Sequence, residues 1–230
     1  MYIPWQAVLP WSFGGNEMIL GISASGRARG ITEEAVRATL DATGEETSFV
    51  SLAGLRINGC TGCLGCSGDN VCKQEDDWNQ IGRAMLTADA IVFGAPDYYG
   101  TINGLGHACL ERTFSFRHRE RYLLAGKLGV SIQVDGRTGS TVRSFIEMLM
   151  GSNKMAVVGS LGAAGFSQCY TCGYGGNCAI GNVVARHGFL EKIEESHLPP
   201  RFCAQEEARD KARMTGRILG SMLRARRGQE

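Results

Sequence analysis

Four cysteines stand close together in the segment GCTGCLGCSGDNVCK, which begins at residue 59. Their spacing is C-x2-C-x2-C-x5-C, and they are Cys60, Cys63, Cys66 and Cys72. A C-x2-C-x2-C run is typical of cubane iron-sulfur clusters, in which each thiolate holds one corner of a large core. The spacing therefore predicts that these thiols bind a [4Fe-4S] cluster, with the glycines between them letting the backbone wrap closely around it.

Two other uses of such thiols stay open on the sequence alone. Tetrahedral zinc also takes four cysteines, although its ligands usually come as two C-x2-C pairs far apart in the chain. Thiol-disulfide exchange is the second alternative. In addition, two-cluster ferredoxins use the last cysteine of a similar run for their other cluster, so the spacing does not prove that all four bind one cluster.

A second cysteine group follows in CYTCGYGGNC, with Cys169, Cys172 and Cys178. Its C-x2-C-x5-C spacing repeats that of the last three cysteines of the first group. Three thiols are one short of a closed tetrahedral site, so a fourth ligand would have to come from elsewhere in the chain or from a neighbouring subunit. Two interpretations stand side by side: a second metal or cluster site, and a glycine-rich flavin loop with incidental thiols.

The elements that must position these groups follow an alternating pattern from residue 18 onward. Short apolar runs predict strands, and amphipathic stretches between them predict helices. The predicted strands are 18–23, 47–52, 88–94, 128–134 and 155–160, and the predicted helices are 31–42, 76–87, 102–114, 139–151 and 204–227. This alternation predicts an α/β fold, a flavodoxin-like doubly wound five-stranded parallel sheet that binds ligands at the carboxyl ends of its strands.

We expect a single domain over residues 18–230, with a compact cysteine-loop insertion at 56–75 and a second cysteine-rich loop at 161–182. Residues 1–17 are predicted to be an N-terminal arm, whose aromatic side chains would pack on this subunit or on a neighbour. The net charge of +1 gives no support for nucleic-acid binding, and the sequence has no apolar run of membrane-spanning length. The first residues lack the basic start of a signal peptide, and Pro4 and Pro10 interrupt their apolar residues, so we expect a cytoplasmic protein. In such a reducing compartment, nine cysteines suit metal or redox chemistry.

Two of the predicted loops have the chemistry of a site for a flat ring with a phosphate tail. The loop SASGRARGIT, residues 23–32, offers hydroxyls, arginines and the N-terminus of a helix, which together favour an anion. The loop APDYYGTING, residues 95–104, offers two tyrosines and glycines that let backbone approach a planar ligand. The plain alternatives are a polar strand-to-helix turn and ordinary packing tyrosines.

These segments together resemble the iron-sulfur flavoprotein family, within the wider group of NAD(P)H-dependent FMN reductases. The resemblance rests on GISASGRARGIT, the compact cysteine motif and IVFGAPDYYGTINGLGHACLERT. It implies that the first loop binds the FMN phosphate through Ser23, Ser25, Arg27 and Thr32. It implies that the second loop holds the isoalloxazine and ribityl through Pro96, Asp97, Tyr98, Tyr99, Gly100 and Thr101. Two positions depart from the family, with Gly26 where proline is usual and Ile31 where asparagine is common.

The sequence thus predicts a flavin-dependent oxidoreductase in which electrons pass between FMN and a [4Fe-4S] cluster. It would exchange electrons with a ferredoxin-like carrier or reduce a small acceptor, and the resemblance implies a homodimer or homotetramer. The alternatives are an NAD(P)H-dependent FMN or quinone reductase, with NAD(P)H as the donor, and a redox-sensing or binding module. No acid, base or nucleophile set stands out in the sequence, which fits electron or hydride transfer.

Overall fold

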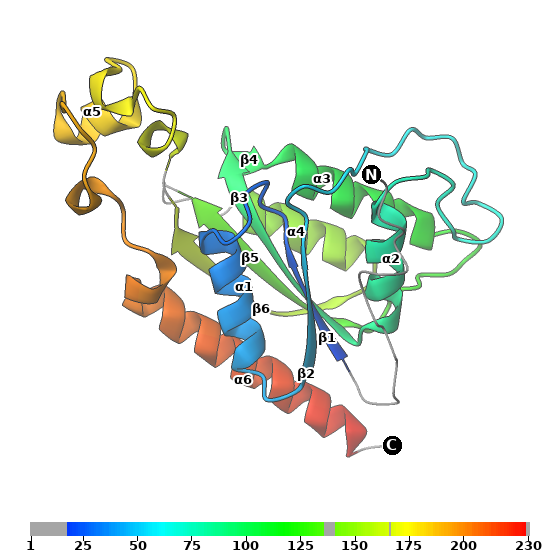
Figure 1. Cartoon of the computed structure of the whole chain (residues 1–230). Coiled ribbons are helices and arrows are strands. Elements are labelled where there is room, and N and C mark those ends of the chain that lie inside the picture. The colour runs from blue at the N-terminus through cyan, green and yellow to red at the C-terminus, as the bar shows by residue number, and fades with distance from the viewer. Residues whose placement is uncertain (1–17, 136–140, 166, 229–230) are drawn as a thin grey trace, which may run out of the picture.

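The computed structural model describes residues 18–135, 141–165 and 167–228, and the predicted arm over residues 1–17 lies outside this part of the chain. Its core is a parallel sheet in the order β2-β1-β3-β5-β6 (Figure 1). The strands are β1 (Met18–Ser23), β2 (Glu46–Ser51), β3 (Ala90–Tyr98), β5 (Leu128–Asp135) and β6 (Ala156–Ala164). A two-residue strand, β4 (Thr101–Ile102), pairs antiparallel with the end of β3. The flavodoxin-like order predicted from the sequence is confirmed.

The central strands have no polar face because helices cover the sheet on both sides. All six residues of β1, MILGIS, are buried, as expected for a parallel strand packed from above and below. One apolar layer involves α1 (Ile31–Asp41) and α6 (Glu206–Arg227). The other involves α2 (Trp78–Thr87), α3 (Gly104–Glu111) and α4 (Thr141–Ser152). A further short helix, α5 (Asn182–His187), lies in a segment that projects beyond the sheet (Figure 1).

Helices α1 and α6 approach each other closely on their face of the sheet. A Cβ atom at Gly216 would overlap the carbonyl oxygen of Thr39, and one at Gly220 would overlap that of Thr43. Two glycines one helical turn apart on α6 therefore let its backbone lie directly against the end of α1.

The structure differs from the sequence prediction at several element ends. Strand β3 does not stop before Pro96 but continues to Tyr98, and this is tolerated because β1 pairs with β3 only as far as Gly94. Strand β6 runs to Ala164, which takes the first residues of the predicted cysteine-rich loop at 161–182 into the sheet. The predicted helix 102–114 is α3 followed by a 3-10 turn over Arg112–Phe116, and α5 was not predicted.

Candidate functional site

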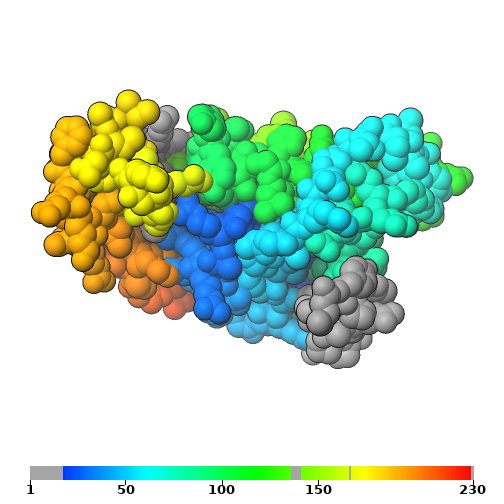
Figure 2. Space-filling model, turned by 45° about the horizontal axis from the view of Figure 1, so that its top comes forward, coloured from blue at the N-terminus to red at the C-terminus, as the bar shows by residue number. Residues whose placement is uncertain are grey.

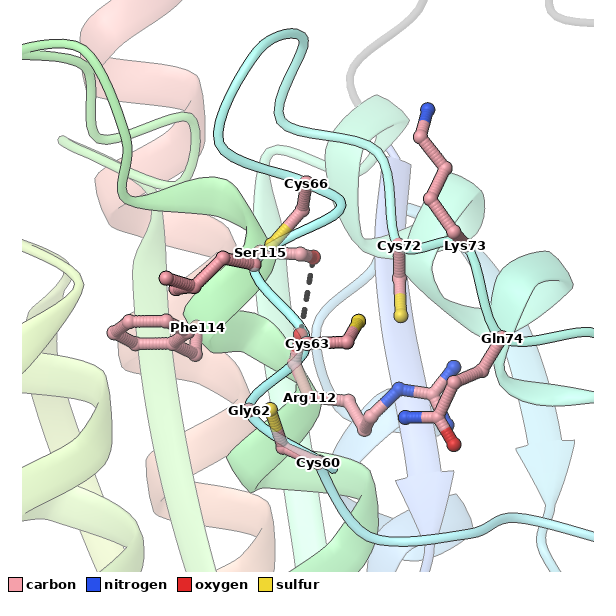
Figure 3. A pocket seen from close by; sticks show the side chains of 11 residues that line it. Cys60, Gly62, Cys63, Cys66, Cys72, Lys73, Gln74, Arg112, Phe114 and Ser115 are labelled. Atoms are coloured by element: carbon pink, nitrogen blue, oxygen red, sulfur yellow. Dashed lines mark hydrogen bonds between the residues drawn. The ribbon is translucent and has the colours of Figure 1, made fainter.

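The four cysteines of the first group line one pocket, which lies in the loop between β2 and α2 (Figure 3). Cys66 is buried, Cys60 and Cys72 are half-buried, and Cys63 is exposed. The loop keeps its shape through backbone turns, in which the Asn70 N–H donates to the carbonyl of Cys66 at 2.8 Å. The four cysteines that the spacing singled out therefore line the same pocket.

The end of α3 holds the start of this cysteine loop. The backbone N–H of Cys60 donates to Oε2 of Glu111 at 2.8 Å, and Nη1 of Arg112 donates to the carbonyl of Asn58 at 2.9 Å. Two successive residues therefore bind the loop immediately before its first thiol. The other end of α3 is tied to the first predicted flavin loop, because Nδ2 of Asn103 donates to the carbonyl of Ala24 at 2.7 Å.

Arg112 forms a buried ion pair with Asp76, and both side chains have no exposed surface. The contact is bidentate: Nη1 lies 2.8 Å from Oδ2 and Nη2 lies 3.1 Å from Oδ1. The guanidinium also lies over the ring of Trp78, with its carbon 4.9 Å from the ring centroid. Burial lowers the pKa of Arg112, but the bond to Asp76 and the neighbouring Cys72 outweigh it and raise the pKa above its ordinary value. Arg112 is therefore a fixed cation beside the pocket.

A histidine stands beside the buried thiol on the opposite side of the loop. Nε2 of His118 lies 3.1 Å from Sγ of Cys66, and the His118 backbone N–H donates to Oδ1 of Asn70 at 2.8 Å. Arg119 adds a bond from its Nη1 to the carbonyl of Gly68 at 3.1 Å. The segment after α3 therefore contacts the second half of the cysteine loop, as Glu111 and Arg112 contact the first.

The thiols differ in their electrostatic surroundings. The pKa of Cys63 is lowered, chiefly by the backbone N–H of Gly65 and the hydroxyl of Thr61. Burial raises the pKa of Cys66, and the negative charge of the neighbouring thiolates adds to the rise. Such mutual repulsion of thiolates is relieved when a bound cationic core takes their charge.

The pocket does not have the geometry of a site for one metal ion. Among residues 18–135, 141–165 and 167–228, no three His, Cys, Asp or Glu side chains converge closely enough to hold a single ion. Zn–S bonds of about 2.3 Å would require tetrahedral sulfurs about 3.8 Å apart. The binding of a [4Fe-4S] cluster, whose irons would each bind one thiolate, stays a prediction.

The second cysteine group lies at the other end of the molecule from the first. Cys169, Cys172 and Cys178 belong to the projecting segment around α5, coloured yellow, whereas the cysteine loop is cyan (Figure 2). Cys172 is exposed, and its sulfur accepts from the N–H of Tyr174 at 3.4 Å. The pKa of Cys169 is lowered by a hydrogen bond with Ser167 and by the N–H of Asn182. As at the first group, no triplet of the described residues is arranged to hold a single ion, and a second metal or cluster site stays a prediction.

The first predicted flavin loop leads from β1 into α1 and presents unused polar groups. Ser25 is buried, and its Oγ accepts from the N–H of Arg27 at 3.1 Å, which leaves its own O–H to donate elsewhere. Oγ of Ser23 is buried with no hydrogen-bond partner among the described residues. Helix α1 begins after Gly30 without a side-chain cap, so its first N–H groups point into the loop, and Thr32 is buried in its first turn. This combination suits a phosphate.

The second predicted flavin loop follows β3 and displays an aromatic ring. Tyr99 is fully exposed and has a left-handed backbone, with φ at 59°, and Gly100 continues the turn at φ 80°. The carboxylate of Asp97 accepts from the Gly100 N–H at 2.7 Å and so fixes the turn. Pro96 is buried at the end of β3, Tyr98 is half-buried, and Thr101 is exposed. Asn103, at the end of this loop, ties it to the first loop through its bond to the Ala24 carbonyl. The structure thus brings the two loops together, and their role in binding FMN stays a prediction.

Comparison with known proteins places these loops in a family. The sequence pattern of the NADPH-dependent FMN reductase family matches residues 18–168. The chain belongs to this family. As a family member it is a flavin-dependent oxidoreductase with FMN as its cofactor.

Several relatives of this FMN reductase family member are named iron-sulfur flavoproteins. One, from Methanocaldococcus jannaschii, is 32% identical over 61% of this chain and 75% of its own length. Another, from Methanosarcina thermophila, is 29% identical over 61% of this chain and 76% of its own length. These matches show that the resemblance inferred from the sequence motifs is correct.

Among solved structures, RosB with a bound 8-demethyl-8-formylriboflavin-5'-phosphate intermediate aligns with a TM-score of 0.63. It is 14% identical, and the alignment covers 92% of this chain and 81% of RosB. A flavone reductase aligns with a TM-score of 0.57 at 19% identity, over 90% of this chain and 63% of that protein. These similarities support the fold. In the described part of the chain, no helix combines the length and hydrophobicity needed to cross a bilayer.

The sequence prediction missed the residues that hold the cysteine loop in this FMN reductase family member. Asp76 lies just before α2, and its carboxylate binds Arg112 and the N–H of Asn58. Glu111 and His118 were not singled out. The available signal was an acidic-basic pair, Glu111 and Arg112, at the end of an otherwise apolar helix. Charges at the end of a helix usually face solvent, so the pair was not informative without the fold.

Proposed function

We propose that this protein is an iron-sulfur flavoprotein that passes electrons between FMN and a [4Fe-4S] cluster held by Cys60, Cys63, Cys66 and Cys72. The observation that carries the proposal is the pocket that these four thiols line, in a chain whose family uses FMN. When bound, FMN supplies exchange of one or two electrons, and a cluster supplies one-electron transfer. The protein would thereby link two-electron and one-electron partners.

The residues around the pocket fit a cluster in three respects. Thiolates are the ligands that iron-sulfur clusters require, and four line the pocket. The backbone N–H of Gly65 bonds the Cys63 sulfur, as donors around clusters commonly do. Finally, Arg112 lines the pocket, and its guanidinium N–H groups are donors of the kind that a negatively charged tetrathiolate cluster accepts.

The first loop would hold the FMN phosphate through Ser25, Arg27 and Thr32 and through the N-terminus of α1. Ser23, at the end of β1, would also contact the phosphate. The buried Ser23 Oγ and Asn103 Oδ1 have no hydrogen-bond partner among the described residues, which is expected where a polar ligand normally binds. The second loop, from Pro96 to Thr101, would contact the isoalloxazine and ribityl with Tyr98, Tyr99 and Gly100 as its surface. Asp97 would keep that turn in place.

The partners we propose are a ferredoxin-like electron carrier or a small-molecule acceptor, with NAD(P)H as a candidate donor. We also propose that the chain acts as a homodimer or homotetramer. Exposed apolar side chains support self-association: Met214, Ile218 and Met222 recur on every fourth residue of α6 and are 57%, 42% and 37% exposed.

The decisive experiment is anaerobic purification with iron, sulfide, zinc and flavin measured on one sample. We expect about four irons and about four sulfides per chain, together with FMN. Replacing Cys60, Cys63 or Cys72 by Ala should remove most of the iron, whereas Cys203→Ala, at an exposed thiol outside both groups, should not. Zinc without iron or sulfide would refute the proposal. About eight irons would assign a cluster to the second cysteine group.

An NAD(P)H-dependent FMN or quinone reductase is the second candidate, favoured by the description of the matched family. It predicts flavin without iron, and turnover with NAD(P)H that survives replacement of Cys72. A cluster-containing protein that transfers electrons to a ferredoxin only when all four thiols are present would exclude it.

A further inference from the structure

Arg112 has hydrogen-bonding capacity that the protein does not use. Asp76 and Asn58 accept both N–H groups of Nη1 and one N–H of Nη2. The Nε–H is buried and has no partner among the described residues, and the other N–H of Nη2 lies parallel to it on the same edge of the planar guanidinium. One edge of Arg112 is therefore saturated by Asp76 and Asn58. The side chain also interacts with the thiol of Cys72, and the Nε–H on the adjacent edge has no partner within hydrogen-bond distance among the described residues.

The unused edge belongs to a residue that lines the cysteine pocket. Arg112 stands in the wall beside Cys72, and Figure 3 shows its side chain among those of the four cysteines. A buried donor without an acceptor is costly, because folding has removed the water that would otherwise accept from it. Such a donor in a pocket wall indicates that an acceptor normally lies there.

We propose that Arg112 tunes the reduction potential of the cluster by donating its Nε–H and Nη2–H to cluster sulfur or to Sγ of Cys72. This inference rests on the proposed function, because it requires a cluster in the pocket. N–H donors to sulfur stabilise the extra negative charge that a cluster gains on reduction, and thereby raise its potential.

The arrangement makes this effect directional. Asp76 neutralises the net charge of Arg112 but binds the edge away from the unused donors, so the pair presents the positive end of a dipole to the pocket. Both side chains are fully covered, so water screens that dipole little. Glu111 holds the backbone of Cys60 at the end of α3, next to Arg112.

The test is the midpoint potential of the cluster in Arg112→Lys, measured by anaerobic redox titration followed by EPR. Lysine retains a cation for Asp76 but cannot offer the parallel N–H pair. We expect reduction to become at least about tenfold less favourable, which is a shift of about −59 mV for one electron. The matched control is Arg119→Lys, since Arg119 also bonds the cysteine loop, at the Gly68 carbonyl, but is exposed. Its potential should equal that of the wild type.

A second measurement uses the unaltered chain. With arginine labelled with ¹⁵N at Nε, the EPR spectrum of the reduced cluster should show a ¹⁵N coupling that persists in Arg119→Lys. An unchanged potential in Arg112→Lys would overturn the proposal. No ¹⁵N coupling in the wild type would overturn it as well, and this second measurement does not require Arg112→Lys to keep its cluster. Absence of iron and sulfide from the wild type would instead refute the proposed function itself.

Discussion

Asp76 and Arg112 form a buried ion pair beside the start of the cysteine loop. Burial raises the pKa of Asp76, but hydrogen bonds from Arg112 and the Asn58 N–H, with the charge of Arg112, outweigh burial and lower the pKa below its ordinary value. A carboxyl with a depressed folded-state pKa stabilises the fold above its unfolded pKa of about 3.9 and loses that contribution as the pH falls through the folded value.

We therefore predict that the free energy of unfolding of the metal-free protein falls as the pH drops below about 4. Asp76→Asn should be less stable at pH 7 by about 3–5 kcal/mol, because it leaves a buried cation unpaired. It should also lose part of this acid dependence. Urea unfolding followed by circular dichroism over a pH series measures both effects. If the free energy of unfolding changes equally with pH in both proteins, Asp76 is not the source of the acid dependence.

The hydroxyl of Ser25 gives a second prediction at this scale. Ser25→Ala should weaken FMN binding at least about tenfold, because it removes a hydrogen bond to a charged phosphate. Riboflavin has no phosphate, so its affinity should stay unchanged. Fluorescence titration of the apoprotein with both flavins measures the difference, and Ser221→Ala on α6 is the control. Equal losses for FMN and riboflavin would place Ser25 elsewhere in the site.

Some of these residues were predictable from the sequence and others were not. Cysteine spacing is local, so the four thiols could be identified without the fold. Arg112 and Asp76 are 36 positions apart, and Cys60 and Glu111 are 51 apart. Only the packing of α3 against the loop brings these pairs together, and a single sequence contains no signal for that packing.

At the level of elements, the contact between α1 and α6 gives a sharp test. Gly220→Ala should destabilise the protein by about 1–3 kcal/mol, because the new methyl group would overlap the carbonyl of Thr43. Gly151→Ala is the matched control, since a Cβ there meets nothing within 4 Å. It should stabilise α4 by about 0.5–1 kcal/mol, as alanine favours helices. Thermal unfolding of both variants measures the two effects. Equal shifts in melting temperature would contradict the close approach of α6 to α1.

Element prediction succeeded where burial was uniform. Strand β1 was assigned with its observed ends, because a short apolar run in an α/β pattern has one interpretation. Helix α5 has six residues, too few for a helical period to stand out. Strand β3 extends through Pro96 because β1 ends earlier, so no β1 residue needs a backbone N–H from the proline. This depends on how far the two strands pair, which the sequence of neither strand shows alone.

For the whole molecule, the exposed stripe on α6 predicts self-association. We expect light scattering after size exclusion to give a mass at least twice the 24.8 kDa of one chain. Ile218→Lys should reduce that mass, because a charge in an apolar interface is costly to desolvate. Met148→Lys on α4, where the side chain is 54% exposed, should leave it unchanged. A wild-type mass of one chain would contradict the prediction.

Helix α3 connects the two sites of the molecule through both of its ends. Asn103 ties its start to the first flavin loop, and Glu111 and Arg112 tie its end to the cysteine loop. One inserted or deleted residue would turn its last residues by about 100° and shift them by about 1.5 Å. The side chains of Glu111 and Arg112 would then point away from the cysteine loop. The length of α3 is therefore a fixed dimension of this protein, and natural variants should accept insertions in neighbouring turns but none within these eight residues.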